Sequence, residues 1–217
     1  MALYSHGIEM IPSHELLKLK NKRVLDISAG TGTSSKFLKK YCGDLSATEA
    51  RTDSFSQKDI PISFLNVEDI SSLEDKIKNF DVAVSCGLFY HLQSHWNILK
   101  SLCTSNLEYF FIETLCGPES PNPQMWWALE DTDYCMNAYS STEKKLMHGT
   151  PNLVWLNDAV NSLDASITCL VRRYEEWRTK SEPNCRWRMM LKVNLRCGKG
   201  LDIKNNLWKN QTGCWLI

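Results

Sequence analysis

The stretch VLDISAGTGTSS at residues 24–35 constrains the fold more than any other part of the sequence. Three apolar residues surround Asp26 and lead directly into a Gly-Thr-Gly turn. An apolar run of this length is typical of a buried strand, and glycine lets a backbone approach a ligand closely because it has no Cβ. Residues 34–41, SSKFLKKY, then have the spacing of an amphipathic helix. The segment therefore predicts a strand, a ligand-facing turn and a helix.

The segments that follow continue this alternation. Apolar runs predict four further strands, at 44–50, 62–67, 80–86 and 108–114, and residues 95–103 have helical spacing. Two more strands are predicted at 166–176 and 185–196, and the short polar turn between them requires the last one to be antiparallel. We therefore expect an α/β fold, a Rossmann-like three-layer sandwich with a seven-stranded, mostly parallel sheet and an antiparallel last strand.

The chain of 217 residues is long enough for one sizeable core, so we expect a single domain over 1–217. Residues 1–20 predict an N-terminal helix that forms part of a lid. Residues 115–150 follow the fifth strand, are rich in Pro, Asn, Ser and aromatic residues, and have no clear period. A stretch of this kind is typical of a binding loop, a lid or a short helical insert. Residues 151–163 predict a helix with Pro151 near its first turn.

Charge and cysteine usage narrow the class of protein. The formal net charge is zero, but residues 166–200 hold nine Arg or Lys and three Glu. That segment is either a patch for nucleic acid or phosphate, or the solvated face of two strands that pair with acidic neighbours. Nine scattered cysteines without a C-x-x-C pair or a zinc spacing indicate reduced thiols in a cytoplasmic protein, with no metal and no membrane contact expected.

The glycine turn resembles that of the class I S-adenosylmethionine-dependent methyltransferases. Their D-x-G-x-G-x-G pattern is present as Asp26, Ser28, Gly30 and Gly32, with serine in place of the first glycine. The resemblance implies that S-adenosylmethionine is the cofactor and that the two glycines line its methionine part. It also implies that Glu49, the acid at the end of the next strand, holds the ribose hydroxyls.

Further positions follow from the same resemblance. The position that meets adenine falls at Asn66, with Val67 beside it, and Ser85 begins the lip on the cofactor side of the fourth strand. The segment SCGLFYHL, followed by a helix and IET, looks most like a branch that contains tRNA wobble-uridine carboxymethyl-transfer enzymes and many uncharacterised methyltransferases.

Catalytic candidates lie just beyond the fourth and fifth strands. His91 is the best candidate for the base, because an imidazole exchanges its proton near neutral pH; the alternative is a histidine that only hydrogen-bonds the backbone. Glu113, which ends the fifth strand, is a second base or the acceptor that orients His91. Trp126, Trp127 and Tyr139 offer an aromatic wall suited to a cationic or amine-bearing acceptor, or form the insert's own small core.

The sequence thus predicts a methyltransferase that modifies oxygen or nitrogen of a small molecule. The absence of an N/D-P-P-Y/F/W motif and of a Pro-Cys pair after the fourth strand argues against DNA bases as acceptors. Two alternatives stay open. One is a non-catalytic protein that binds S-adenosylmethionine and regulates a partner. The other is an RNA-modifying enzyme, which requires one group of basic residues to share the cofactor's face: Arg172, Arg173, Arg186, Arg188 and Lys192.

Overall fold

The structure is a computed structural model that describes residues 7–52, 55–118, 120–132, 139–140, 142–179 and 182–195. Over residues 172–179 and 182–187 it describes the backbone alone. Residues 1–6 of the expected lid and residues 133–138 of the expected insert therefore lie outside the described part.

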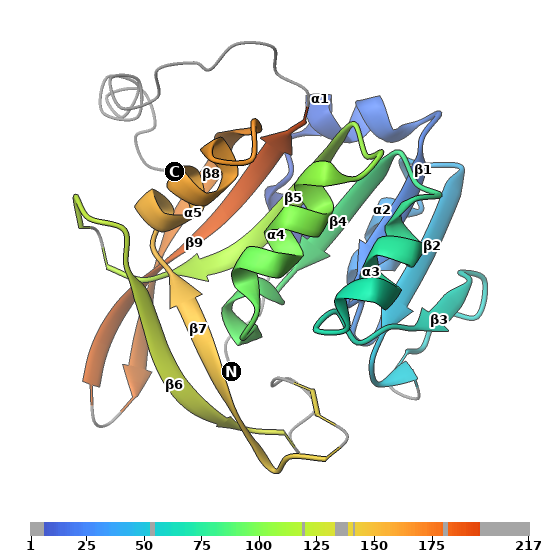
Figure 1. Ribbon diagram of the computed structural model, residues 1–217. Coiled ribbons are helices and arrows are strands. Elements are labelled where there is room, and N and C mark those ends of the chain that lie inside the picture. Colours follow the sequence, from blue (N-terminus) through green and yellow to red (C-terminus); the bar gives the residue numbers. More distant parts are fainter. Residues whose placement is uncertain are drawn as a thin grey trace.

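Seven strands form one sheet, as predicted, and their order is β3-β2-β1-β4-β5-β9-β8 (Figure 1). The first five strands are parallel to their neighbours, and β9 runs antiparallel to both β5 and β8. The order reverses between β1 and β4, and at such a switch point ligands bind beyond the carboxyl ends of the strands. The strands are β1 Arg23–Ile27, β2 Asp44–Glu49, β3 Ile62–Phe64, β4 Val82–Cys86, β5 Tyr109–Cys116, β8 Ser166–Thr179 and β9 Glu182–Asn194.

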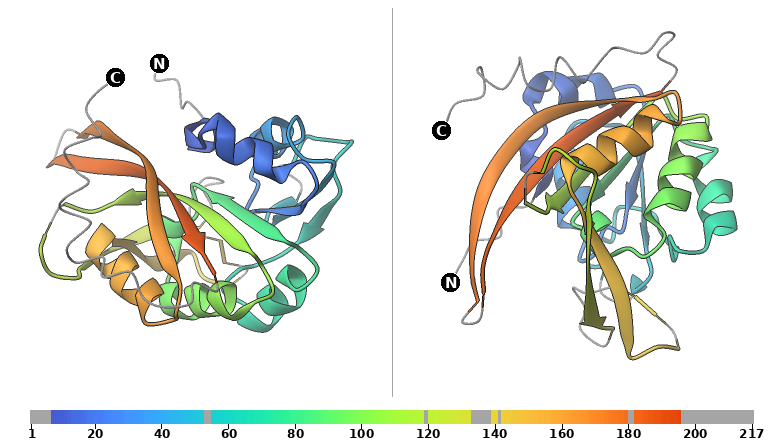
Figure 2. Two further views of the ribbon diagram at one scale, coloured as in Figure 1. Left: turned by 90° about the horizontal axis from the view of Figure 1, so that it is seen from above. Right: turned by 60° about the vertical axis from the view of Figure 1, so that its left-hand side comes forward.

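Helices cover both faces of the sheet, which confirms the three-layer arrangement (Figure 2). Successive strand residues point to opposite faces, so Leu25 packs under one layer and Val24 under the other. One layer holds α3 Ile70–Ile77, α4 His95–Thr104 and α5 Leu153–Asn161. The other holds the 3-10 helices η1 Gly7–Met10 and η2 Leu17–Leu19 with α1 Ser13–Leu16 and α2 Thr33–Leu38. The short 3-10 helix η4 Phe89–His91 follows β4.

The insert after β5 differs from the prediction. It contains an antiparallel hairpin of β6 Met125–Asp131 and β7 Lys145–Pro151, rather than an irregular loop or a helical turn. Figure 1 shows this hairpin projecting past the ends of the parallel strands. Pro151 ends β7, so it does not open the following helix; the side chain of Asn152 instead caps α5 by accepting a hydrogen bond from the backbone N–H of Trp155.

The helix α3 was also missing from the sequence interpretation. Its N-terminus is capped by Asp69, and Leu73 and Ile77 are its buried residues, one turn apart. The other residues of the helix are mostly polar, so two buried residues were too few to indicate a helical period in the sequence. A crossover is nevertheless required here, because the parallel β3 and β4 cannot be joined by a tight turn.

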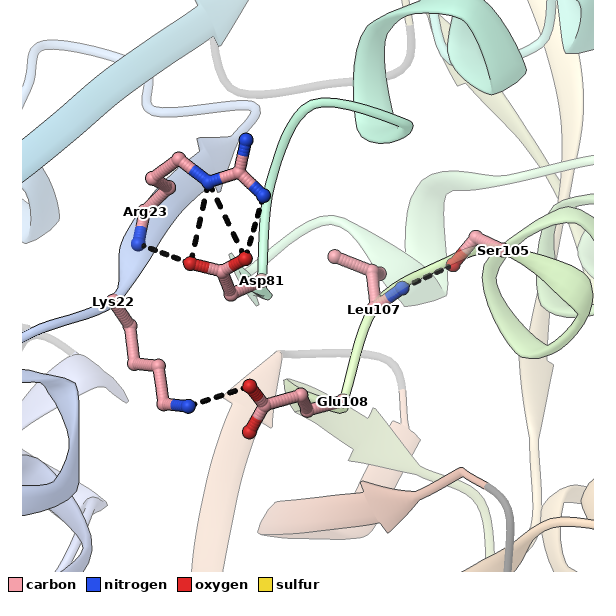
Figure 3. A network of polar contacts seen from close by, with 6 residues as sticks. All are labelled: Lys22, Arg23, Asp81, Ser105, Leu107 and Glu108. Carbon is pink, nitrogen blue, oxygen red and sulfur yellow. Dashed lines mark hydrogen bonds and ion pairs between the residues drawn. The ribbon is translucent and has the colours of Figure 1, made fainter.

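Ion pairs hold the amino ends of the strands together (Figure 3). The Asp81 carboxylate accepts hydrogen bonds from the backbone N–H of Arg23, at 2.8 Å, and from its guanidinium, at 2.7 Å. Lys22 donates to Glu108 just before β5. These contacts tie β1, β4 and β5 together at their amino ends and leave the carboxyl ends of the strands for a site.

Within the described residues, no helix is both long enough and apolar enough to cross a bilayer.

Candidate active site

The turn after β1 presents its backbone to open space at Gly30, whereas the side chains of Phe55 and Gln57 cover Gly32. Ser28, Gly30 and Gly32 all have positive φ angles, of 58°, 56° and 85°, a region that glycine occupies without strain. A Cβ added at Gly30 would meet no atom within 4 Å. The backbone N–H of Gly30 donates to Glu49 Oε2 at 2.8 Å, so the end of β2 fixes the turn. A ligand can therefore lie directly against this backbone.

Asp26 lies at the base of the turn and is fully buried. Its Oδ2 accepts hydrogen bonds from the hydroxyls of Ser34 and Ser35, at 2.7 and 2.6 Å. Its Oδ1 is buried and has no hydrogen-bond partner among the described residues. Burial raises the pKa of Asp26 to about 6 despite the two hydroxyls, and the nearby Glu49 charge adds to the shift. A buried carboxylate oxygen without a donor is the kind of group that a ligand's ammonium satisfies.

The parallel pairing of β2 and β3 places Glu49 beside Phe64, two residues before Asn66. The two carboxylate oxygens of Glu49 accept from the backbone N–H groups of Gly30 and Arg51, at 2.8 and 3.0 Å. The Asn66 side-chain carbonyl accepts from the N–H of Glu68 at 3.2 Å, and Val67 is buried next to it. A carboxylate has about four lone-pair sites, so Glu49 keeps acceptor capacity for a diol.

The end of β4 forms the next wall. Ser85 is buried, and its hydroxyl has no hydrogen-bond partner among the described residues. Burial raises the pKa of the Cys86 thiol well above its ordinary value, and the Glu113 charge adds to this, so the thiol stays protonated at neutral pH. Cys86 therefore lines the wall and is no nucleophile. The chain turns at Gly87, whose N–H donates to the Glu113 carbonyl at 3.1 Å.

Glu113 lies opposite Cys86 on β5 and is almost fully buried. Its Oε1 forms an ion pair with Arg188 Nε of β9 at 3.4 Å. The expectation that this carboxylate orients His91 is not met, because the carboxylate hydrogen-bonded to His91 is Glu130.

His91 ends η4 and meets the hairpin. Its Nδ1 lies 2.7 Å from Glu130 Oε2 of β6, and both side chains are 14% exposed. From β7, His148 places its ring centroid 6.0 Å from that of His91. Its Nδ1 lies 2.6 Å from the Tyr90 carbonyl, and the N–H of Gly149 donates to the Leu92 carbonyl at 2.8 Å. The hairpin is thus docked onto the segment that follows β4.

The three expected aromatic residues do not share one wall. Side chains alternate along a strand, so Trp126 lies on the Glu130 face of β6, where its ring covers Gly117. Trp127 lies on the other face, half-exposed, with its ring 6.3 Å from that of buried His95. Tyr139 stands beyond the hairpin over the Arg51 guanidinium, 5.1 Å from its ring centroid, next to the exposed Phe64.

Comparison with solved structures decides the fold. The chain superposes on the N-terminal domain of EvdMO1, solved with S-adenosylhomocysteine and D-fucose, with a TM-score of 0.61 and 12% identity over 90% of this chain and 85% of that one. A Burkholderia thailandensis 1,6-didemethyltoxoflavin-N1-methyltransferase gives 0.54 and 11%, over 87% and 76%. An S-adenosylmethionine-dependent methyltransferase from Mesorhizobium loti gives 0.52 and 11%, over 86% and 95%. The chain has the S-adenosylmethionine-dependent methyltransferase fold. No protein-family model matches the sequence, and no curated protein does.

Two of the five basic residues that an RNA-binding surface would require instead form ion pairs with acidic residues of the same chain. Arg188 pairs with Glu113, and Lys192 pairs with Glu15 of α1 at 2.7 Å; both basic side chains are buried. The side chains of the other three lie outside the described part.

Sequence reasoning did not identify His148 or Glu130 as neighbours of His91. Both lie on strands that had no recognisable period. Neither MWWALED nor KLMHGTP alternates apolar and polar residues, so the usual signal of a strand was absent from both segments.

Proposed function

We propose that the protein is an S-adenosylmethionine-dependent methyltransferase that modifies an oxygen or nitrogen atom of a small molecule. The observation that carries the proposal is the Gly30 turn, with its open backbone and its N–H held by Glu49. That arrangement suits a nucleoside joined to an amino acid: the turn faces the methionine part, and Glu49 accepts the ribose hydroxyls.

The remaining parts of the cofactor have matching groups. The buried Asp26 Oδ1 would accept from the methionine ammonium, directly or through the turn. Asn66 offers a carbonyl to the adenine amino group, Val67 offers an apolar surface, and Ser85 offers a hydroxyl near the sulfonium. When bound, the cofactor supplies an electrophilic methyl group, so the protein has to align the acceptor and remove its proton.

The acceptor side is assigned to the space between η4 and the hairpin. His91 is the proposed base, and Glu130 holds its ring in one orientation and stabilises the imidazolium that forms. Glu113 remains a candidate second base, although its ion pair with Arg188 already occupies one of its carboxylate oxygens. Trp126 and Tyr139 are proposed to contact the acceptor, whereas the position of Trp127 gives it a packing role.

A small acceptor is favoured over RNA. The buried, paired state of Arg188 and Lys192 removes two of the five charges that an RNA surface would need. A small acceptor is also supported by the methyltransferase solved with bound 1,6-didemethyltoxoflavin and by the EvdMO1 domain solved in the presence of D-fucose.

The test begins with the purified protein. Mass spectrometry of the extracted ligand and calorimetry with S-adenosylmethionine should show 1:1 binding. Transfer of a labelled methyl group is then measured on a panel of hydroxylated and amine-bearing small molecules and on total tRNA. Absence of cofactor binding would refute the proposal, and transfer to tRNA alone would replace the small molecule with RNA. Tight binding with no transfer to any acceptor would favour a regulatory role.

A further inference from the structure

Three side chains of metal-ligating type converge between η4 and the hairpin: His91, Glu130 and His148. One donor atom from each lies within 4.8 Å of the other two. They come from three separate elements, η4, β6 and β7, so their meeting depends on the docking of the hairpin rather than on a local sequence spacing.

The hydrogen bonds of His148 prepare it for ligation. A carbonyl oxygen only accepts, so the 2.6 Å contact with the Tyr90 carbonyl places the proton on Nδ1 of His148. The lone pair of the ring is then on Nε2. A metal-ligating histidine usually donates its other ring N–H to a carbonyl or a carboxylate in this manner, which fixes the tautomer and the ring orientation.

The pair of His91 and Glu130 is already close to ligand geometry. Its two atoms lie 2.7 Å apart, whereas two ligands on a tetrahedral ion with bonds of about 2.0–2.1 Å lie about 3.3 Å apart. An ion would therefore part the pair by about 0.6 Å. Both side chains are mostly shielded from water, which limits the reorganisation that binding requires.

We propose that His91, Glu130 and His148 bind a divalent first-row transition-metal ion of the zinc class. Two imidazoles and one carboxylate suit Zn²⁺ better than Mg²⁺ or Ca²⁺, which prefer oxygen ligands. Three protein ligands leave a fourth position open, as in catalytic rather than structural zinc sites.

The role of the ion rests on the proposed function. The open position would take a hydroxyl oxygen of the acceptor, and the ion would lower that hydroxyl's pKa so that its proton passes to solvent. The alkoxide oxygen then attacks the methyl carbon; the carbon–sulfur bond breaks, its electron pair stays on sulfur, and S-adenosylhomocysteine leaves. With the ion bound, His91 acts as a ligand and no longer as the base.

The experiment measures ion binding apart from methyl transfer. Metal-free protein without S-adenosylmethionine is titrated with Zn²⁺ by calorimetry and with Co²⁺ by visible absorption. We expect one equivalent to bind and four-coordinate Co²⁺ bands to appear. His148→Ala and Glu130→Gln should each weaken binding by more than about 100-fold, beyond the 10–100-fold typical of an outer-shell partner. The control is His14→Ala, which removes a largely exposed histidine elsewhere and should bind as the wild type does.

Several outcomes would overturn the site. The first is that neither Zn²⁺ nor Co²⁺ binds in a saturable way, and the second is that the His148→Ala variant binds them as tightly as the wild type does. The third is a sulfur-to-cobalt charge-transfer band, which would show that the ligands come from the nine cysteines of the chain. If His148→Ala fails to fold, as judged by circular dichroism, His91→Ala provides the same test from η4. Failure to bind S-adenosylmethionine in the separate calorimetry would refute the proposed function but not the metal site. Failure to bind Zn²⁺ and Co²⁺ would refute the metal site but not the proposed function.

Discussion

Replacing Glu49 by alanine tests the cofactor site most directly. In the structure, its carboxylate already accepts two backbone N–H groups, from Gly30 at 2.8 Å and from Arg51 at 3.0 Å. Those bonds orient the carboxylate before any ligand arrives, so little ordering entropy remains to be lost when ribose binds. Two of its roughly four lone-pair sites stay available for the 2′- and 3′-hydroxyls.

The expected loss is set by the charge-assisted hydrogen bonds to ribose. A hydrogen bond to a charged group contributes about 1.5–3 kcal/mol, and the carboxylate charge is shared with the two N–H groups that it already accepts. We therefore expect Glu49→Ala to lose the binding free energy of one such hydrogen bond rather than of two. A loss of about 1.5–3 kcal/mol corresponds to a dissociation constant for S-adenosylmethionine raised about 10- to 150-fold. Glu49→Gln keeps an acceptor oxygen and should lie near the lower limit.

Calorimetric titration with S-adenosylmethionine measures the change, after circular dichroism has established the folded fraction. Asp81→Ala is the matched control, because it also removes a carboxylate that accepts a backbone N–H at 2.8 Å, at the opposite edge of the sheet (Figure 3). It should lower stability without changing affinity. Unchanged affinity in Glu49→Ala, or an equal loss in Asp81→Ala, would refute the assignment of ribose to Glu49.

Three further predictions concern the turn, its buried acid and the acceptor side. Gly30→Ala should weaken cofactor binding at least about 10-fold in calorimetry, because its Cβ would enter the open space beside the turn. The same substitution should lower the free energy of unfolding by about 1–2 kcal/mol, because alanine is strained at a φ of 56°. Gly43→Ala is the control and should change neither quantity, since its Cβ would meet only one carbonyl oxygen, at 3.9 Å. Asp26 has a folded-state pKa of about 6, above its unfolded value near 3.8, so its destabilising effect is absent at low pH and complete by about pH 7. Denaturant unfolding should therefore show the wild type losing about 3 kcal/mol relative to Asp26→Asn between about pH 3 and pH 7. A pH-independent difference between the two proteins would contradict this. His91→Asn should lower kcat by roughly 10²–10⁴-fold in single-turnover assays with little change in cofactor affinity, and near-normal turnover would leave His91 a structural residue.

The sheet and the cofactor side could be predicted from the sequence because their signals are local. Strands covered on both faces must be apolar throughout, which made β1, β4 and β5 recognisable as short runs. A positive φ favours glycine, and Gly30 and Gly32 stand at two of the three such positions in the turn after β1, with Ser28 at the third. The carboxylate that holds the turn also ends a strand, so its place was visible in the sequence.

The acceptor side was decided by the tertiary structure. The hairpin strands β6 and β7 are partly exposed, so their side chains did not show a buried pattern, and the insert was interpreted as irregular. The alternation that separates Trp126 from Trp127 exists only once these residues form a strand.

The partners of the two acceptor-side groups were likewise beyond a local pattern. Glu130 is 39 residues from His91, and the Tyr90 carbonyl is 58 residues from His148. Contacts over such distances depend on how the hairpin docks onto η4, and docking is set by long-range packing that no neighbouring residues encode. The amino-acid sequence alone thus predicted the glycine turn and the strand ends that we propose for the cofactor, whereas only the folded chain brought His91, Glu130 and His148 together.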